Sequence, residues 1–325
     1  MHVLPRLRHA LLIAVATLAM AAGARAEPAR FASLTLENDF FTGSDRHYTN
    51  GVQLAFLADI AKAPEALREH GPLAWSADPQ AVLAIGQRIY TPANTDIDPP
   101  DPNDRPYAGW LYLMTDVRTR AAATIDHLTI TAGLVGPASG ASQTQDFTHR
   151  LLGEVNSKGW DSQVRPRATF MAGFERAWPG IAFGDFAGLR YDLATRVGAT
   201  VGTPMTYADA GAVLRYGRNL PADLPVTHIS LGPPRDGFRG APAFGWYAWA
   251  GIDARAVAYN TFIQGDTFND ASHVRREPYG YDAQVGIAAT WSAARVGFTL
   301  VQRSREFVGQ SGPDRFGQLA VSFAY

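Results

Sequence analysis

Apolar and polar residues alternate along twelve short segments of this chain, and this period of two constrains the fold more than any other feature. In one segment Val52, Leu54 and Phe56 share a face, while Gln53 and Ala55 share the other. Such alternation predicts strands with one apolar and one more polar face. The predicted strands span residues 31–38, 51–59, 81–90, 107–118, 127–136, 168–178, 186–199, 207–217, 244–259, 279–291, 294–306 and 315–325.

The predicted fold class is all-β, and the architecture is an antiparallel transmembrane β-barrel of about twelve strands. A soluble β-sandwich gives the same alternation. Two details favour an outer-membrane barrel: aromatic residues such as Trp110 and Trp178 gather near strand ends, and the last strand alternates up to a terminal aromatic, Tyr325. After residue 26 no stretch is apolar enough for a membrane helix, so a membrane location requires a barrel.

The first 26 residues have the pattern of a secretory signal peptide. Arg6 and Arg8 precede an uncharged apolar run, and Ala24-Arg25-Ala26 resembles a cleavage site. We therefore expect residues 1–26 to be removed and residues 27–325 to form one barrel domain. The chain has no cysteine, which excludes thiol catalysis and a disulfide scaffold. Its charge balance gives no indication of a nucleic-acid partner.

Three polar clusters fall in connections that this strand count places at one rim. They span residues 38–51, 90–109 and 136–163. An even number of strands leaves both chain ends on the periplasmic side, so the clusters lie at the outer rim and are expected to form one site. Two inner connections, 60–80 and 218–243, are longer than such barrels usually have, and their topology is not predicted.

Strand parity predicts the directions in which side chains of the first cluster point. If Leu34 and Leu36 face lipid, Asp39 faces inward and Asn38 outward; the same reasoning places Thr49 inward, close to Asp39. Bulges are common at barrel rims and can redirect a side chain. A site that straddles the barrel wall is consistent with this pattern.

His149 is the best candidate for a general base. It follows Gln145 by four residues, so one turn of helix would place both on the same face. Imidazole is the usual base near neutral pH. The alternative is a loop histidine that only caps backbone groups. His47, in the first cluster, is a second candidate base.

The acidic residues of the first cluster indicate a hard cation. Glu37, Asp39 and Asp45, with nearby carbonyl groups, provide the oxygen ligands that calcium prefers. A second acidic run, from Asp96 to Asp104, lies in a proline-rich segment and is more typical of a solvated loop. No His-Glu-x-x-His motif is present, which argues against zinc.

Taken together, these pieces resemble the outer-membrane lipid A 3′-O-deacylase family, LpxR, over essentially the whole mature chain. Each motif is weak alone, but their order and spacing are specific. The matching pieces are Glu37-Asn38-Asp39, Asp45-Arg46, Tyr48-Thr49-Asn50-Gly51, Tyr90-Thr91-Pro92, Asp104 to Gly109, Gly136-Pro137, Gln145-x-x-x-His149 and Gly159-Trp160-Asp161-x-Gln163.

The resemblance implies a twelve-stranded barrel that removes a 3′-linked acyloxyacyl group from lipid A of the outer-leaflet lipopolysaccharide, with Ca²⁺. By motif, His149 would activate water, with Gln145 supporting it. Asn38, Asp39 and Thr49 would build the metal and oxyanion site, with Asn38 and Asp39 as metal ligands. The substrate is phosphorylated, so Arg46 or Arg105 is expected to bind phosphate.

Two departures from the family concern substrate contacts. The family resemblance implies a lysine after the Tyr-Thr-Pro stretch, but none occurs between Lys62 and Lys158. It also implies a glutamate six residues after the histidine, where this chain has Val155. The rival hypotheses are a porin-like or structural barrel without catalysis, and a calcium-dependent outer-membrane phospholipase.

Overall fold

The fold was analysed in a computed structural model of the whole chain. It describes residues 31–43, 46–58, 65, 69–70, 79–153, 155–223, 238, 240–265 and 274–325. The predicted signal peptide lies outside the described residues, as does Asp45. Most of the two long inner connections, 60–80 and 218–243, also lies outside them.

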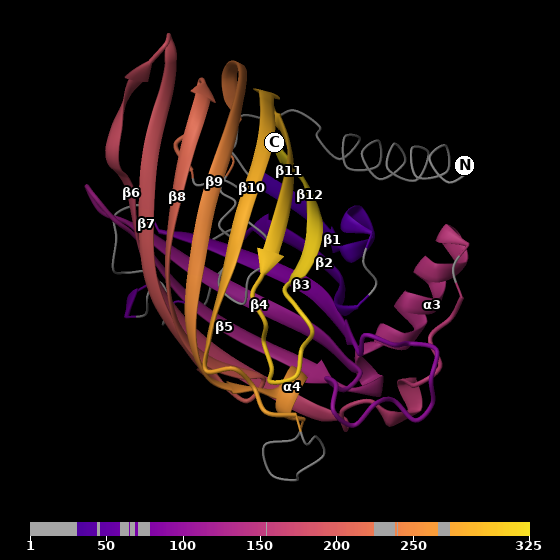
Figure 1. Cartoon of the computed structure of the whole chain (residues 1–325). Coiled ribbons are helices and arrows are strands. Elements are labelled where there is room, and N and C mark those ends of the chain that lie inside the picture. The colour runs from indigo at the N-terminus through magenta and orange to yellow at the C-terminus, as the bar shows by residue number, and fades with distance from the viewer. Residues whose placement is uncertain are drawn as a thin grey trace.

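Twelve antiparallel strands form a closed barrel in which each strand pairs with its sequence neighbours and β1 pairs with β12 (Figure 1). Closure satisfies the backbone hydrogen bonds of every strand, which a lipid environment requires. The predicted all-β barrel of about twelve strands is therefore confirmed. The strands are β1 (Phe31–Asn38), β2 (His47–Leu57), β3 (Gln80–Thr91), β4 (Ala108–Arg120), β5 (Ile125–Val135), β6 (Arg167–Phe186), β7 (Leu189–Gly202), β8 (Met205–Arg218), β9 (Ala241–Asn260), β10 (Tyr279–Ser292), β11 (Ala294–Arg303) and β12 (Asp314–Ala324).

Two strand predictions were wrong in a way that matters. Residues 179–185 are not a connection but part of β6, which continues through a register shift between Trp178 and Ala182. The β6–β7 hairpin consequently projects well beyond its neighbours (Figure 1). β2 begins at His47, four residues earlier than predicted, so Thr49 belongs to the strand.

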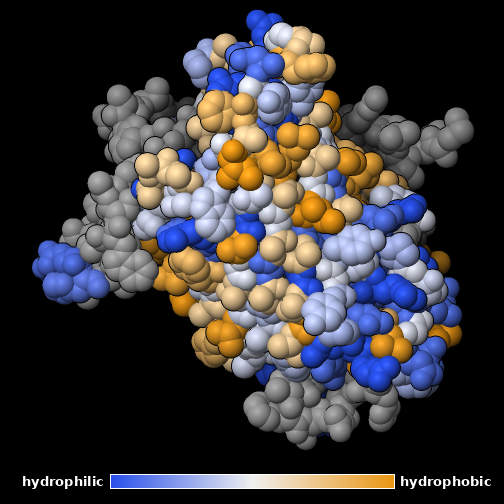
Figure 2. Space-filling view, turned by 60° about the vertical axis from the view of Figure 1, so that its left-hand side comes forward, coloured by the Kyte–Doolittle hydropathy of each residue, from blue (hydrophilic) through white to orange (hydrophobic). Residues whose placement is uncertain are grey.

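The outward face of the barrel is apolar. Leu113, Ile130 and Phe170 alternate with buried residues and are each more than half exposed. In Figure 2 hydrophobic residues are spread over the strand wall, and hydrophilic residues gather toward the lower right. This alternation is the pattern of a wall that contacts lipid on one side.

The described part of the chain contains no helix that is both long and apolar enough to cross a bilayer.

Paired charges fill much of the barrel interior. Arg196 of β7 contacts Glu175 and Asp209 on the two adjacent strands, and Asp253 on β9, one strand further away. Asp282 of β10 accepts hydrogen bonds from both Arg255 and Arg303 and is fully buried. Buried charges need such partners because each one has lost its water. These side chains occupy the lumen instead of lining an open water channel.

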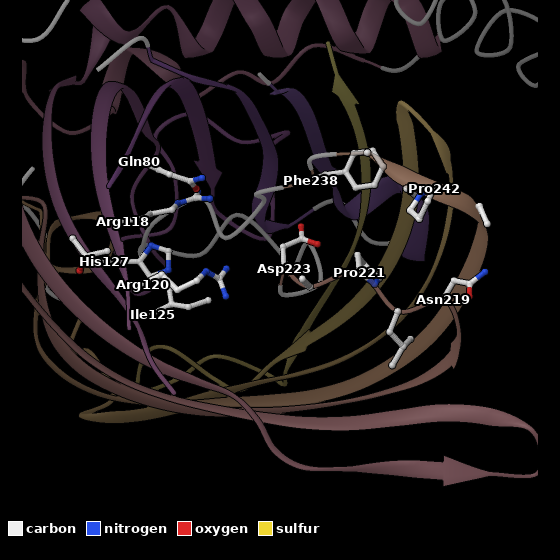
Figure 3. Close-up of a pocket in the computed structure, with 16 residues that line it drawn as sticks. Gln80, Arg118, Arg120, Ile125, His127, Asn219, Pro221, Asp223, Phe238 and Pro242 are labelled. Atoms are coloured by element: carbon white, nitrogen blue, oxygen red, sulfur yellow. The ribbon is translucent and has the colours of Figure 1, made fainter. Parts of the chain in front are cut away.

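A cavity of about 500 Å³ lies inside the barrel at the inner end (Figure 3). Arg118, Arg120 and His127 line one side of it, and Asp223 and Phe238 line the other. Its lining comes from the inner ends of the strands, so it is separate from the rim where the polar clusters lie.

We refer to the buried ion pairs of Arg196 and Asp282 as the lumen network. These buried pairs are expected to contribute more to stability than exposed ion pairs. Asp282→Asn removes the shared partner of two buried arginines and should lower the free energy of unfolding by roughly 3–5 kcal/mol. Asp126→Asn is the matched control, because Asp126 also accepts two hydrogen bonds from an arginine, Arg176, but that pair is exposed. Urea unfolding in detergent micelles measures both. Equal losses in the two variants would contradict a structural role for the lumen network.

Candidate functional site

A helix stands outside the barrel wall at the outer rim. It is α3 (Ala141–Leu152), in the connection between β5 and β6, and Figure 1 shows it beside the strands and outside the lumen. Gly140 precedes it and Gly153 follows it, both with left-handed backbone conformations that glycine adopts without strain. The one helical turn expected to place Gln145 and His149 on the same face is thus part of a helix of 12 residues.

The start of α3 is fixed against outward-facing positions of β3 and β4. A Cβ atom on Gly109 would lie only 2.2 Å from the Cβ of Ala141, so glycine permits this close approach. The side chain of Gln87 donates a hydrogen bond of 2.7 Å to the carbonyl oxygen of Ser139. Ser139 belongs to the short helix η4 (Pro137–Ser139) that leads into α3. These contacts place α3 on the outer face of the wall.

The hydrogen bonding of His149 sets its tautomer. Its Nδ1 lies 2.7 Å from the carbonyl oxygen of Val155. A carbonyl oxygen only accepts, so Nδ1 carries the proton and the lone pair of the neutral ring is on Nε2. A neutral imidazole in this tautomer can take a proton at Nε2, as a general base must.

Trp160 fixes the orientation of the Gln145 amide. Its indole N–H donates a hydrogen bond of 2.8 Å to Oε1 of Gln145. Since an indole nitrogen only donates, the amide oxygen must face Trp160, and the amide nitrogen faces Nε2 of His149 at 3.4 Å. This last contact is long for a hydrogen bond, so it orients the ring without holding its lone pair tightly. Trp160 is itself buried in a cluster with Ile89, Tyr107 and Ala141.

Asn38 and Asp39 lie where β1 ends and the short helix η1 (Asp39–Thr42) begins. The side-chain oxygen of Asn38 caps η1 by accepting a hydrogen bond from the backbone N–H of Phe40. The carboxylate of buried Asp39 accepts one from the backbone N–H of Arg46. The two ends of the connection are thereby held together.

The structure corrects the predicted inward direction of Thr49. A register shift between Tyr48 and Asn50 leaves Thr49 as an extra residue in β2, so Tyr48 takes the inward position and hydrogen-bonds Glu37. The hydroxyl of Thr49 lies 2.8 Å from that of Thr91. The prediction assumed unbroken alternation, which a bulge reverses.

The outer wall connects the two halves of the site. Ile89 packs with Trp160 and pairs in the sheet with Asn50, while Thr91 lies two residues further along the same strand. Asn50 in turn pairs with Asn38. The Gln145–His149 pair and the Asn38–Thr49 group therefore share the outer face of the wall near the rim.

The two candidate phosphate ligands differ in accessibility. Arg105 is 0% exposed; it donates to the carboxylate of Glu306 and the carbonyl of Phe262, and stacks on the ring of Tyr90. Burial alone would raise the pKa of the Glu306 carboxyl, but Arg303 and Arg105 hold it below its ordinary value. Arg105 therefore stabilises the interior and is closed to a phosphate group. Arg46, which lies near Ser311 and Asp314, is partly exposed at the rim.

His47, the second candidate base, also has a structural role. Its ring is buried between Asp314, at 2.7 Å, and Asp104, at 3.4 Å. Burial alone would raise the pKa of Asp104, but the hydrogen bonds from His47 and the backbone N–H of Ala93 keep it below its ordinary value. The rest of the second acidic run, Asp96, Asp98 and Asp101, is exposed, as expected of a solvated loop.

The chemistry of the first cluster fits a hard cation weakly. Asp39 supplies one carboxylate, Asn38 an amide oxygen and η1 its backbone carbonyls, all of them oxygen donors of the kind calcium takes. Among the described residues no group of three or more His, Cys, Asp or Glu side chains could hold a metal. With so few charged ligands, such a site would need water or substrate oxygens to complete its shell.

Sequence reasoning identified Gln145 and His149 but assigned no role to Trp160 or Val155. Trp160 stood in a Gly-Trp-Asp motif, and an indole N–H near a polar cluster is a signal that could have marked it. The contribution of Val155 is a backbone carbonyl, which no side-chain pattern reveals.

A protein family and a solved structure resemble this chain. A family model described as outer membrane protein LpxR matches residues 10–325. Among solved structures, LpxR from Salmonella typhimurium is similar over 90% of this chain and 99% of its own, with a TM-score of 0.72 and 20% identity. The β domain of the Bordetella autotransporter BrkA covers 91% of this chain and 99% of its own, with a TM-score of 0.43 and 8% identity.

No curated protein sequence matches the chain. The family match extends over nearly the full length of the chain. The chain belongs to the LpxR family of outer membrane proteins and is located in the bacterial outer membrane.

Proposed function

We propose that this protein is an esterase that removes a 3′-linked acyl or acyloxyacyl group from lipid A in the outer leaflet. The observation that carries the proposal is His149, whose tautomer is fixed with Nε2 as acceptor and which stands on the lipid side of the wall. A base between α3 and the outer wall is on the membrane side of the barrel and not in its lumen, so membrane lipids are nearer to it than solutes in the lumen. The family supports a lipid A deacylase; the choice of the 3′ position comes from the resemblance.

The proposed reaction is hydrolysis by activated water. Nε2 of His149 takes a proton as the water oxygen attacks the acyl carbon, and the bond between that carbon and the sugar oxygen then breaks. The proton passes to the sugar oxygen, so the products are a fatty acid and a free hydroxyl group. The hydrogen bond from Nδ1 to Val155 keeps the ring in place throughout.

Asn38, Asp39 and Thr49 form the electrophilic side of the proposed site. Asp39 and Asn38 would hold calcium, which when bound polarises the ester carbonyl and stabilises negative charge on its oxygen. Partly exposed Arg46 at the same rim is the better placed of the two arginines to bind a phosphate of lipid A.

The described interior argues against a pore. Inward-facing residues such as Thr35, Gln53 and Thr299 are nearly inaccessible to solvent, whereas the walls of a water-filled pore are wet. A phospholipase would use the same histidine chemistry on a glycerol ester, so phospholipid hydrolysis has to be measured beside lipid A.

Removing the base should abolish deacylation. His149→Ala is expected to lower the rate by about 10²- to 10⁴-fold, the usual contribution of a general base. Mass spectrometry of lipid A from cells that make either protein measures the loss of the acyl chain. His127→Ala, a buried histidine at the opposite end of the barrel, is the control. Full activity in folded His149→Ala would overturn the catalytic assignment, and phospholipid cleavage with intact lipid A would overturn the substrate.

Removing the indole N–H of Trp160 should disturb the position of His149 without leaving a cavity. Trp160→Phe keeps the ring packing but frees the Gln145 amide, and we expect roughly tenfold lower kcat with little change in KM, about the worth of one hydrogen bond. ¹⁵N NMR of His149 should show a shifted Nε2 resonance while Nδ1 stays protonated, because the carbonyl of Val155 still accepts its proton. Trp110→Phe is matched to it, because Trp110 donates a similar bond to Thr169 inside the barrel. An unchanged Nε2 resonance together with an unchanged kcat would contradict the positioning role.

Calcium dependence is tested at Asp39. Chelation should stop lipid A deacylation, and calcium should restore it. Asp39→Asn should weaken terbium binding, read by luminescence, by roughly tenfold or more, because ligand charge sets affinity for such ions. Asp101→Asn, in the exposed acidic run, should leave terbium binding unchanged. Equal binding by the Asp39 variant and the unmodified protein would refute the proposed ligand.

A further inference from the structure

The exposed side of α3 carries a row of large apolar side chains. Phe147 is 62% exposed and Leu151, one helical turn later, is 44% exposed. Val155, just beyond the helix, is 74% exposed. We refer to these three residues as the apolar ridge. An exposed ridge of this kind is costly in water and marks a contact surface.

The ridge lies opposite the catalytic face of the same helix. Phe147 is two residues from both Gln145 and His149, which is about 200° around an α-helix. Gln145 and His149 are buried against the wall, whereas Phe147 and Leu151 point away from it. The exposed polar residues Gln143 and Arg150 lie along one side of the ridge. The free surface of the helix is therefore amphipathic.

The ridge continues the lipid-facing surface of the barrel. α3 begins against Gly109, and the next outward positions of β4 in the direction of the membrane are Leu111 and Leu113. Leu113, 62% exposed, is about 13 Å along the strand from Gly109. On neighbouring β3, the outward residue Ile85 is exposed too. A helix that packs against this part of the wall is adjacent to the hydrocarbon chains of the membrane.

A second apolar element is on the other side of the site. In η1, Phe40 is exposed, and Phe41 packs on the outward ring of Phe298 at 5.7 Å. Asn38 and Thr49 thus lie between two apolar flanks on one outer wall. Amphipathic helices in such places rest in the boundary between headgroups and acyl chains.

We propose that the apolar ridge of α3 inserts into the outer leaflet and contacts the hydrocarbon chains of its lipids. The helix is then an interfacial anchor whose far side holds His149 at the depth of lipid esters. The inference stands on the exposed side chains and on the outer-membrane location. It does not rest on the proposed reaction, and its test needs no activity.

The absence of cysteine from the sequence makes a direct test available. Single variants Phe147→Cys and Leu151→Cys, labelled with bimane and reconstituted in bilayers, are compared with Gln143→Cys and Arg150→Cys on the polar side. Leu113→Cys is the lipid-facing standard. Brominated phosphatidylcholine should quench the labels at 147 and 151 to about the extent seen at 113, and aqueous iodide should quench those at 143 and 150.

Folding of each variant is checked by its heat-dependent shift in gel mobility, a property of intact barrels, and only folded protein is compared. The proposal is overturned if iodide quenches the labels at 147 and 151 as strongly as that at 143, because the ridge would then be in water. It is also overturned if neither quencher reaches them, since protein, such as a second copy of the chain, would then cover the ridge.

Discussion

Closure of the sheet between β1 and β12 is the constraint on which the rest of the structure depends. In a bilayer every backbone N–H and C=O needs a partner within the protein, so the wall has to be continuous. Once the lumen is filled by pairs such as Arg196 with Asp253 and Arg255 with Asp282, chemistry on membrane lipids can only take place at the rim or on the outer face. The candidate residues are found at that edge.

The outer face can hold α3 only because a glycine, Gly109, stands where the chain packs against the wall. Gly109 lets the chain at Ser139 and Ala141 lie against the strand backbone, and Gly136 has the positive φ needed for the chain to leave β5 toward it. From there, helical periodicity alone determines that Gln145 and His149 face the wall. Gly109 and Gly136 therefore help to position His149, although both are distant from it in the sequence.

Period-two patterning predicted the barrel because every strand has one face in lipid and one in a polar interior, and the spacing of Gln145 and His149 predicted their shared helix face. The direction of Thr49 was not predictable in this way, because a single extra residue at the bulge reverses parity without changing composition. The burial of Arg105 could not be predicted from the sequence for a different reason. Its partners, Glu306 and Phe262, come from connections more than 150 residues away in sequence.

Val155 contacts His149 through its backbone carbonyl. The carbonyl oxygen accepts the Nδ1 proton, a contact that the chain can make with any residue at this position. The carbonyl therefore fixes the tautomer without placing a charge beside the ring. The side chain points outward, 74% exposed, in line with Phe147 and Leu151. Residue 155 thus supplies a backbone acceptor to His149 and an apolar side chain to the exposed surface of this segment.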